Sequence, residues 1–257
     1  RPGGGDFARG YDTTVGGMAS HFVWVNRSKE SLALDLKTAE GAGALRRLLE
    51  RADVFLHNLA PGAVARLGFE SQALRKAFPR LVICEISGYG RSGPYRDKKA
   101  YDLLVQSETG LVSITGTPDN PSKVGISIAD IAGGMYAFSG ILAALLRRER
   151  SGDGAVLDVS LFDALAEWMG YPAYYTHYGG TAPERTGARH AAIAPYGPYA
   201  AGDGGVVYLG LQNDREWVRF CEQVLERPAL ARDARFATNA ARVAHHAELA
   251  EHVAGTF

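Results

Sequence analysis

The sequence predicts an α/β fold in which a large domain with a parallel β-sheet precedes a second, smaller α+β domain. Short apolar segments alternate with helical patterns between residues 31 and 86, as in parallel β-α-β units. Near residue 179 the composition becomes rich in glycine and charge, and a hairpin pattern follows. With 257 residues, 46% of them hydrophobic, the chain is long enough for one large or two modest domains.

The alternation occupies the first third of the chain. Residues 31–36, 54–59 and 81–86 are short apolar runs that favour strands, whereas 39–52 and 61–78 have helical patterns. Strands joined in this way by helices are expected to run parallel.

The stretch around Asp130 combines a predicted strand with a predicted helix. Val124, Ile126 and Ile128 alternate as in a strand, and residues 131–146 are apolar on nearly every side, so we expect a buried helix there. A carboxylate in its first turn meets unpaired backbone N–H groups and the positive end of the helix dipole, which keep it ionised at neutral pH. By spacing alone, Asp130 is either an N-cap or a functional carboxylate.

Further patterns complete the predicted elements. Residues 155–159 favour a strand, 103–112 and 161–177 favour helices, and 199–209 favour a hairpin whose turn contains Gly202, Asp203 and Gly204.

We expect a large domain at 1–178, a linker at 179–196 and a small domain at 197–257. The chain does not begin with Met and closes inside an amphipathic pattern, so we expect elements to be missing at both ends.

Composition narrows the class of partner. Lys and Arg number 28 and Asp and Glu number 28, so no global charge attracts the chain to nucleic acid or a membrane surface. Cys84 and Cys221 form neither a C-x-x-C motif nor a disulfide framework, which indicates a reducing compartment. No signal peptide and no uninterrupted apolar run of membrane-spanning length is apparent, so we expect a cytoplasmic protein with neither nucleic acid nor membrane as partner.

Familiar cofactor and metal motifs do not hold in their context. Gly88-Tyr-Gly90-Arg-Ser-Gly93 matches G-x-G-x-x-G, but Pro94 and the polar residues after it do not begin a helix, which argues against a dinucleotide site. His245, His246 and His252 lie in a charged helical pattern without Cys or H-E-x-x-H, so a solvated helix face is favoured over a metal site. The G-x-S-x-G and G-x-x-x-x-G-K-[ST] patterns are absent.

Eight short landmarks follow one another along the chain. They are Arg1-Pro-Gly-Gly-Gly-Asp6, Asn26-Arg-Ser-Lys29, Leu34-Asp-Leu-Lys37, Asn58-Leu-Ala-Pro-Gly62, Arg66-Leu-Gly-Phe69, Ser87-Gly-Tyr-Gly-Arg-Ser-Gly-Pro94, Tyr101-Asp102 and Ala129-Asp130. In this order they resemble the family III CoA-transferases, which include formyl-CoA transferase, carnitine CoA-transferase and α-methylacyl-CoA racemase. The resemblance covers nearly the whole chain.

The resemblance implies that Asp130 is a nucleophile. In the family, the matching aspartate attacks an acyl-CoA thioester, forms a mixed anhydride and then carries CoA as an aspartyl thioester before passing it to a free carboxylic acid. Each acyl transfer develops an oxyanion that needs N–H donors, for which Gly133 and Gly134 are candidates. The resemblance also implies a Rossmann-like large domain and a homodimer of interlocked rings.

The same resemblance suggests where CoA binds. Basic residues match positions around the nucleotide and its phosphates, and Arg suits phosphate because it donates in pairs. Three further residues match positions around the adenine and pantetheine. The basic residues are Arg1, Lys37, Arg66 and Lys99, and the others are Leu34, Asn58 and Leu59. CoA would be a substrate; no permanently bound cofactor and no metal is implied.

Tyr101 and Asp102 bear on which family reaction is expected. In the family's racemases, which remove and replace an α-proton, a histidine precedes the aspartate at this place. Here it is Tyr101, and a phenol with an ordinary pKa of about 10 is a poor base at neutral pH, so CoA transfer is favoured over racemisation. Tyr101 and Asp102 would then orient the acyl carboxylate or the nucleophile, or Tyr101 simply packs at a helix start.

The linker supplies candidates for binding the acid. His190 is a candidate substrate contact, and Arg185 and Arg189 are candidates for a distal carboxylate if the acid is a dicarboxylate such as succinate or itaconate. We therefore expect a CoA-transferase, with succinyl-CoA as a candidate donor. An acyl-CoA racemase and a catalytically silent CoA-binding protein remain the alternatives.

Overall fold

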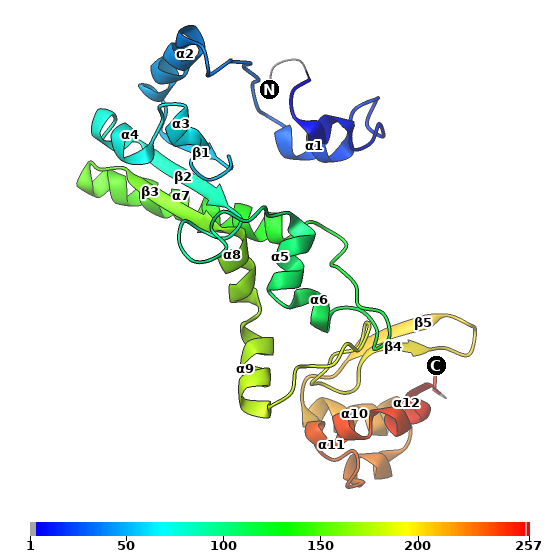
Figure 1. Ribbon diagram of the computed structural model, residues 1–257. Helices are drawn as coiled ribbons and strands as arrows, with labels where there is room; N and C mark the ends of the chain where they lie inside the picture. Colours follow the sequence, from blue (N-terminus) through cyan, green and yellow to red (C-terminus); the bar gives the residue numbers. More distant parts are fainter. Residues whose placement is uncertain (1–3, 255) are drawn as a thin grey trace. The chain divides into compact units, whose positions relative to one another are not determined.

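The structure is a computed structural model that describes residues 4–254 and 256–257 (Figure 1). Its contacts group into two compact units: Arg1–Ala100 with Asp130–Ala164, and Tyr101–Ala129 with Leu165–Phe257. Arg1 itself lies outside the described residues. The predicted domain division at 178 and 197 concerns the whole protein and stays a prediction.

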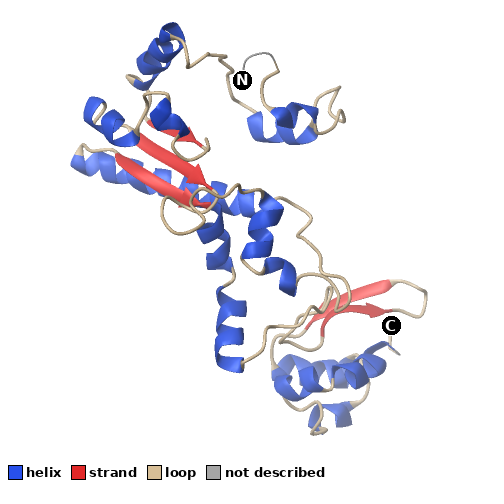
Figure 2. Ribbon diagram, viewed as in Figure 1, coloured by secondary structure: helices blue, strands red, loops and turns tan. Residues whose placement is uncertain are grey.

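The first unit contains a parallel three-stranded sheet in the order β1-β2-β3 (Figure 2). Its strands are β1 (Val54–His57), β2 (Val82–Ser87) and β3 (Ala155–Ser160). All three confirm strands predicted from apolar runs, and they pair in parallel register. Their carboxyl ends meet at one edge of the sheet, where loops carry ligand-binding residues in open α/β sheets.

Short helices precede and connect the strands. They are a 3-10 helix (Phe7–Gly10), α1 (Ser20–Asn26), α2 (Ala39–Leu49), α3 (Ala63–Arg66) and α4 (Ser71–Ala77).

The helix predicted at 39–52 is confirmed as α2, which begins where the Thr38 side chain accepts a hydrogen bond from the Gly41 N–H at 3.1 Å. The single helix predicted at 61–78 is instead two, because Gly68 takes a positive φ of 83° that an α-helix does not accommodate.

One sheet face packs on α2, α3 and α4. Phe55, Ile83 and Val156 lie side by side on the three strands and project to this face, since the register pairs them directly. Ile83 is fully buried. The same core includes Leu49, Val64, Phe69, Leu74 and Leu81 from the surrounding helices and loops.

The other face packs on α7 (Ile128–Ser151), which is followed by β3 and α8 (Leu161–Trp168). Leu157, on the face opposite Val156, lies where a Cβ on Gly140 would come within 3.4 Å of its Cδ1. A Cβ on Gly133 would overlap with Cδ2 of Leu161. Glycine at these two positions allows the helix backbone to approach the sheet and the start of α8.

The helix predicted at 131–146 is confirmed, but the expectation that it is buried is wrong. Met135 is 53% exposed, Phe138 is 57% exposed and Leu146 is 70% exposed. The helix is apolar on several sides, and the sheet covers only one of them, so an apolar face remains uncovered in this chain. That face contains Met135, Phe138, Leu142 and Leu146.

Of the helices in the described residues, α7 alone is long and apolar enough to cross a membrane by length and composition. No uninterrupted apolar run of that length is apparent in the sequence, because glycine and polar residues break the run without lowering its mean hydropathy much. One such helix is weak evidence for a membrane span, because length and composition alone do not distinguish it from a helix of a soluble protein.

Two predicted strands are wrong. Residues 31–36 form a loop that leads into α2, and residues 124–127 form a loop that leads into α7. Both have the apolar alternation of a strand, but neither pairs with the described sheet, whose order is β1-β2-β3. A strand needs a partner for its backbone groups, and alternation does not reveal whether one is present.

The second unit begins with α5 (Asp102–Glu108) and α6 (Leu111–Ile114), the region predicted as one helix at 103–112. They are separate because Gly110 between them has a φ of 84°. The helix predicted at 161–177 is likewise two, α8 and α9 (Gly170–Gly179). The predicted hairpin is confirmed as β4 (Tyr196–Ala200) and β5 (Val206–Gly210), with Gly204 at a φ of 84° in its turn.

The C-terminal residues fold around the hairpin. Their helices are α10 (Asp214–Gln223), a 3-10 helix (Pro228–Arg232), α11 (Asn239–Ala244) and α12 (His246–Ala254). Trp217 and Phe236 are fully buried at the centre of this core.

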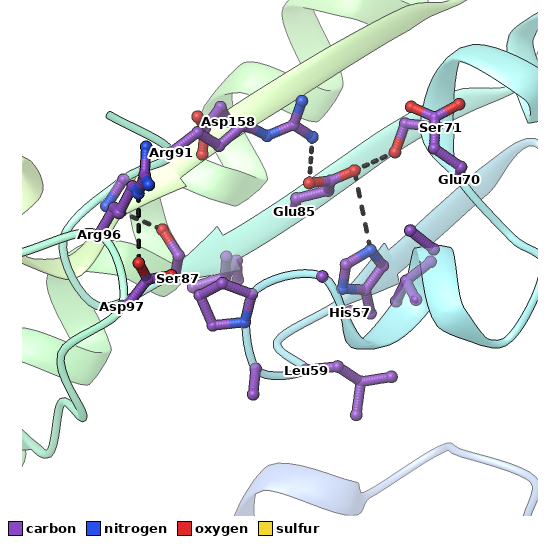
Figure 3. A pocket seen from close by; sticks show the side chains of 17 residues that line it. His57, Leu59, Glu70, Ser71, Glu85, Ser87, Arg91, Arg96, Asp97 and Asp158 are labelled. Carbon is purple, nitrogen blue, oxygen red and sulfur yellow. Dashed lines mark hydrogen bonds and ion pairs between the residues drawn. The ribbon is translucent and has the colours of Figure 1, made fainter. Parts of the chain in front are cut away.

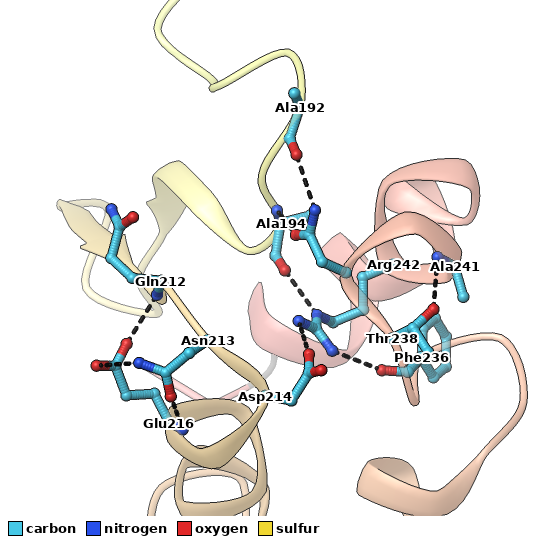
Figure 4. A network of polar contacts seen from close by, with 11 residues as sticks. Ala192, Ala194, Gln212, Asn213, Asp214, Glu216, Phe236, Thr238, Ala241 and Arg242 are labelled. Atoms are coloured by element: carbon cyan, nitrogen blue, oxygen red, sulfur yellow. Dashed lines mark hydrogen bonds and ion pairs between the residues drawn. The ribbon is translucent and has the colours of Figure 1, made fainter.

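Arg242 is a charged group within the C-terminal core and is 1% exposed. Its guanidinium donates to the carbonyls of Ala194 at 2.7 Å and Phe236 at 3.0 Å, and to a carboxylate oxygen of Asp214 at 2.8 Å (Figure 4). The Asn239 side chain donates to the carbonyl of Ala192 at 2.8 Å and accepts from the Ala194 N–H at 3.1 Å. The end of the predicted linker is thus fixed to α11.

Candidate active site

Asp130 lies in the first turn of α7, as the sequence predicts. Its neighbours Ala129 and Ala132 are fully buried, while Asp130 itself is exposed. The first N–H groups of an α-helix have no partner within the helix, and the dipole is positive at this end. Such an environment favours the charged form of a carboxylate.

Asp102 fixes the start of this helix. Its Oδ1 accepts a hydrogen bond from the backbone N–H of Ala129 at 2.8 Å, and its Oδ2 accepts one from Nε2 of Gln106 at 2.6 Å. The sequence predicts that Asp102 orients the acid or the nucleophile, and this geometry places its carboxylate on the residue just before Asp130. Tyr101 precedes α5 and is 63% exposed, so its ring is not packed into a core.

Gln106 is the residue that sequence reasoning missed. It is fully buried, and its Oε1 accepts a hydrogen bond from the backbone N–H of Val124 at 2.9 Å while its Nε2 donates to Asp102. A signal was present: Gln106 follows three apolar residues in a helical pattern, four positions after Asp102, which places the two side chains on one helix face.

The predicted oxyanion donors lie in the second turn of α7. Backbone N–H groups at such positions ordinarily bond to the carbonyl four residues earlier. Gly133 is at a close approach to Leu161, whereas a Cβ on Gly134 would have open space around it. Packing against Leu161 therefore explains why residue 133 is a glycine, whereas no contact explains the glycine at residue 134.

A cavity of about 430 Å³ lies at the carboxyl ends of the strands in the first unit (Figure 3). Ligands of open α/β sheets bind at this edge. Its lining comes from the loop after β1, the start of α4, the end of β2 and the loop after it, and β3. The labelled residues are His57, Leu59, Glu70, Ser71, Glu85, Ser87, Arg91, Arg96, Asp97 and Asp158.

Glu85 is the centre of the polar contacts in this cavity. It accepts a hydrogen bond from Ser71 and pairs with Arg91, which also lies 3.5 Å from Asp158 (Figure 3). His57 Nε2 is 4.0 Å from Glu85. Burial lowers the pKa of His57, outweighing the nearby Glu85, and burial raises the pKa of Asp158.

The structure brings some of the predicted CoA contacts to the cavity but not all of them. Leu59 lines it, and Asn58 is the residue before Leu59 in the loop after β1. The lining does not include the remaining described candidates, which lie in the loop before α2, at the end of α3 and in the loop before α5: Leu34, Lys37, Arg66 and Lys99. Arg1 lies outside the described residues.

The linker residues predicted to contact the acid bind different partners within the fold. Arg185 donates to the carbonyls of Ser113, Thr117 and Pro118, at 3.1, 3.0 and 2.6 Å, so its guanidinium holds a turn together. His190 accepts from the Ala192 N–H at 3.0 Å, and its ring centroid lies 5.3 Å from that of Tyr196.

Arg189 is half-buried and lies near Tyr199 and His246. Burial raises the pKa of Tyr199, and the charge of Arg189 offsets part of this rise. Burial lowers the pKa of His246, and the charge of Arg189 lowers it further.

No group of three or more His, Cys, Asp or Glu side chains suited to a metal ion occurs within residues 4–254 and 256–257. Of the three histidines near the C-terminus, His246 and His252 belong to α12, and His245 lies between α11 and α12. His245 and His252 each stack edge-on against Phe236.

Comparison with known proteins agrees with this arrangement. The sequence model of CoA-transferase family III matches residues 1–257. A succinate–glutarate CoA-transferase of Agrobacterium fabrum is 40% identical over 90% of this chain and 58% of its own length. An acetyl-CoA:oxalate CoA-transferase of Acetobacter aceti is 39% identical over 95% of this chain and 63% of its own length. The chain thus spans about three fifths of these relatives.

Solved structures show the same fold. A CAIB/BAIF family protein from Brucella suis superposes with a TM-score of 0.77 at 35% identity, covering 93% of this chain and 63% of the other. The orthorhombic form of Rv3272 from Mycobacterium tuberculosis superposes with a TM-score of 0.84 at 28% identity, covering 98% and 67%. The family model matches the whole length of the chain, and Asp130 lies at the start of the helix that Asp102 caps. This chain therefore belongs to CoA-transferase family III.

Proposed function

We propose that the protein transfers CoA from an acyl-CoA to a free carboxylic acid, with the Asp130 carboxylate as nucleophile. The observation that carries this proposal is the position of Asp130 in the first turn of α7, next to the residue that Asp102 caps, in a family III chain. The helix N-terminus favours the ionised carboxylate, and ionisation is the condition for nucleophilic attack.

The proposed reaction is a sequence of balanced acyl transfers. The Asp130 carboxylate attacks the thioester carbonyl, the C–S bond breaks, and CoA leaves as a thiolate, so that the acyl group stays on Asp130 as a mixed anhydride. The thiolate then attacks the aspartyl carbonyl and releases the donor acid as a carboxylate, leaving an aspartyl-CoA thioester. The acceptor carboxylate attacks this thioester and expels CoA as a thiolate, which gives a second mixed anhydride. The thiolate then attacks the carbonyl of the new acyl group, and the bond to Asp130 breaks to release the product acyl-CoA and the Asp130 carboxylate. No proton or electron is gained or lost overall.

Each tetrahedral intermediate places negative charge on an oxygen near the start of α7. Backbone N–H groups of the first helical turn and the dipole stabilise such charge. Gly133 and Gly134 remain proposed donors, although both lie one turn further into the helix. Tyr101 and Asp102 are proposed to orient the acid and the nucleophile.

We further propose that CoA binds along the carboxyl edge of the sheet. The cavity has four carboxylate residues, Glu70, Glu85, Asp97 and Asp158, against two arginines. An acidic lining does not suit phosphate but does suit the neutral, hydrogen-bonding pantetheine or adenine. Leu59 and Asn58 would contact these parts together with Leu34.

The phosphates of CoA are assigned by this proposal to basic residues outside the cavity. They are Arg1, Lys37, Arg66 and Lys99. No permanently bound cofactor is needed for the steps described above.

The names of the relatives support a dicarboxylic acid as acceptor. One relative is named for succinate and glutarate, one for oxalate, and another, from Chloroflexus aurantiacus, for succinyl-CoA and D-citramalate. We propose succinyl-CoA as donor and a dicarboxylate as acceptor, with Arg189 and His190 near the distal carboxylate. Arg185 is not part of this proposal, since three carbonyls occupy its guanidinium.

We also propose that the intact protein is a cytoplasmic homodimer of interlocked rings, as the family resemblance implies. The apolar face of α7, formed by Met135, Phe138, Leu142 and Leu146 and exposed in this chain, supports only the association of two copies. Soluble proteins rarely leave such a face uncovered. A second copy of the intact protein would cover it.

The test is to trap the acyl-enzyme. The intact protein is incubated with succinyl-CoA and then with hydroxylamine, beside Asp130→Asn, and the peptide that contains Asp130 is examined by mass spectrometry. Aspartyl hydroxamate in the wild type and none in the variant supports the proposal. Absence of hydroxamate with succinyl-CoA and with other acyl-CoAs, despite measurable CoA binding, contradicts it. Exchange of the α-proton in deuterium oxide would then separate an acyl-CoA racemase from a silent CoA-binding protein.

A further inference from the structure

Gln106 connects α5 to the segment that leads into the helix of the proposed nucleophile. It lies in α5, is fully buried, and reaches both the carboxylate of Asp102 and the backbone of Val124. The segment from Val124 to Ala129 is therefore held at both ends, by Gln106 at its beginning and by Asp102 at its end.

The chemistry of these contacts fixes the orientation of the Gln106 amide. The Asp102 carboxylate only accepts hydrogen bonds, so it must face the amide NH₂. The Val124 N–H only donates, so it must face the amide oxygen. Both contacts, at 2.6 and 2.9 Å, are satisfied in one orientation, and flipping the amide would break both.

Asp102 is held by this contact in the position where it caps α7. Its second oxygen accepts from the Ala129 N–H at 2.8 Å, so rotation of the carboxylate is opposed from two sides. Ala129 is fully buried, and Asp130 follows it directly. Asp130 thus follows the residue at which a chain of hydrogen bonds from Val124 through Gln106 and Asp102 ends.

We propose that Gln106 is a positioning residue for the Asp130 nucleophile, acting through Asp102 and the backbone of residues 124–129. The inference rests on the proposed function of Asp130, and it assigns Gln106 no contact with the substrate. Displacement of a reacting group by about 1 Å can lower a rate about 100-fold. A positioning residue should therefore affect the rate of aspartyl adduct formation more than CoA binding.

Exchanging the two side-chain types provides a sharp test. Gln106→Glu places a carboxylate against Asp102, which replaces a hydrogen bond with repulsion. Asp102→Asn leaves only one side-chain oxygen to accept from both the Gln106 amide and the Ala129 N–H, so one of these two hydrogen bonds is lost. In the double variant, the introduced asparagine can donate to the introduced glutamate and accept from the Ala129 N–H. The introduced glutamate can accept from the Val124 N–H, so all three hydrogen bonds are available again.

The readouts are the rate of hydroxamate formation at Asp130, the KM for succinyl-CoA, and amide exchange of the peptide covering residues 124–130 in the protein without substrate. We expect Gln106→Glu to slow adduct formation at least about tenfold, with KM nearly unchanged and exchange accelerated. The double variant should regain most of the wild-type rate of adduct formation and most of the slow amide exchange. Gln223→Glu, the same change at an exposed position in α10, is the matched control.

Three results would overturn the inference. Wild-type rates and exchange in both Gln106→Glu and Gln106→Asn would show that the contacts position nothing, whereas Gln106→Glu alone could keep both hydrogen bonds by taking up a proton. A folded double variant that restores slow exchange but not the rate would mean that Asp102 acts on the substrate through its own charge. A rise in KM as large as the fall in rate would indicate a general loss of structure.

If Gln106→Glu does not fold, Gln106→Asn serves instead. The shorter amide reaches only one of the two partners, and the same slowed adduct formation is expected, whereas wild-type rates would overturn the inference. Failure of the wild type itself to form hydroxamate, by contrast, would contradict the proposed function, and the exchange measurement would still report on Gln106.

Discussion

The carboxylate of Asp102 accepts a hydrogen bond from the backbone N–H of Ala129, 27 positions further along the chain. This contact caps the helix on which Asp130 lies. Asp102, which the family resemblance places near the reacting groups, therefore also stabilises the start of α7. Its proposed part in the reaction and its part in the fold can be separated by experiment.

Replacing Asp102 with alanine should destabilise the protein and slow the chemistry. The loss of a helix cap costs about 1 kcal/mol, and Gln106 is left buried with one donor unsatisfied, which adds about 1–3 kcal/mol. Urea unfolding of the variant measures the first effect, and hydroxamate trapping at Asp130 measures the second. Unchanged stability would show that the cap contributes nothing in solution.

Two glycines in α7 should respond in opposite ways to alanine. In Gly133→Ala the new methyl group overlaps with Leu161, and the strain should exceed the gain in helix propensity, for a net loss of about 1–2 kcal/mol. In Gly134→Ala nothing lies within 4 Å of the new atom, so stability should rise by about 0.5–1 kcal/mol. Thermal unfolding of both variants is the measurement. A drop in activity of Gly134→Ala without a drop in stability would support a role for this backbone in catalysis.

Arg242→Met should destabilise the C-terminal core by about 2–4 kcal/mol, because the buried carbonyls of Ala194 and Phe236 lose their donor. Arg235→Met removes pairs to Asp233 and Glu248 on the surface, and a far smaller change is expected. Unfolding in urea, followed by tryptophan fluorescence, compares them. Equal effects would mean that the buried network adds nothing beyond a surface pair.

The unfolding free energy should fall as pH is lowered from about 7 to about 5, where histidines titrate. Burial lowers the pKa of both His57 and His246 below 6.5. In this window the unfolded chain binds protons that the folded chain does not, so acid favours unfolding. The double variant His57→Gln and His246→Gln should show a flatter dependence. An unchanged slope in urea titrations would contradict the assignment.

Arg189→Ala and Arg185→Ala should separate binding from structure. If Arg189 contacts a distal carboxylate, its loss raises the KM for a dicarboxylic acceptor about tenfold and leaves a monocarboxylic acceptor unaffected. Loss of Arg185 removes three hydrogen bonds within the fold and should lower stability instead. Steady-state kinetics with both acceptor classes, beside unfolding curves, distinguishes the two variants.

Sequence patterns predicted the three strands of the described sheet and the hairpin, although β3 pairs with β2 from a distant part of the chain. β1, β2 and β3 each follow from a short apolar run bounded by turns, and the hairpin follows from the glycines at its turn. Residues 31–36 and 124–127 have the same alternation, yet they are loops, because a strand exists only when another strand accepts its backbone hydrogen bonds. Alternation reports which side chains are apolar and does not report pairing.

The place of Asp130 in the first turn of a helix was predictable from the sequence, and its part in a site stays a prediction. Asp130 could be placed at a helix start because a carboxylate there has a local physical reason. The contact between Asp102 and Ala129, and the part that Gln106 plays in it, depend on the approach of α5 to the start of α7, which spacing does not encode. Exposure of α7 was missed for a similar reason, since an apolar helix does not show how many of its sides are covered.

The uncovered face of α7 should make association of the protein depend on temperature. Attraction between apolar surfaces in water weakens on cooling, because the gain in entropy from releasing ordered water is increasingly offset by an unfavourable enthalpy. The chain carries 28 basic and 28 acidic residues, so at neutral pH little net charge keeps two copies apart. An assembly that covers Met135, Phe138, Leu142 and Leu146 would thus hold together when warm and loosen in the cold.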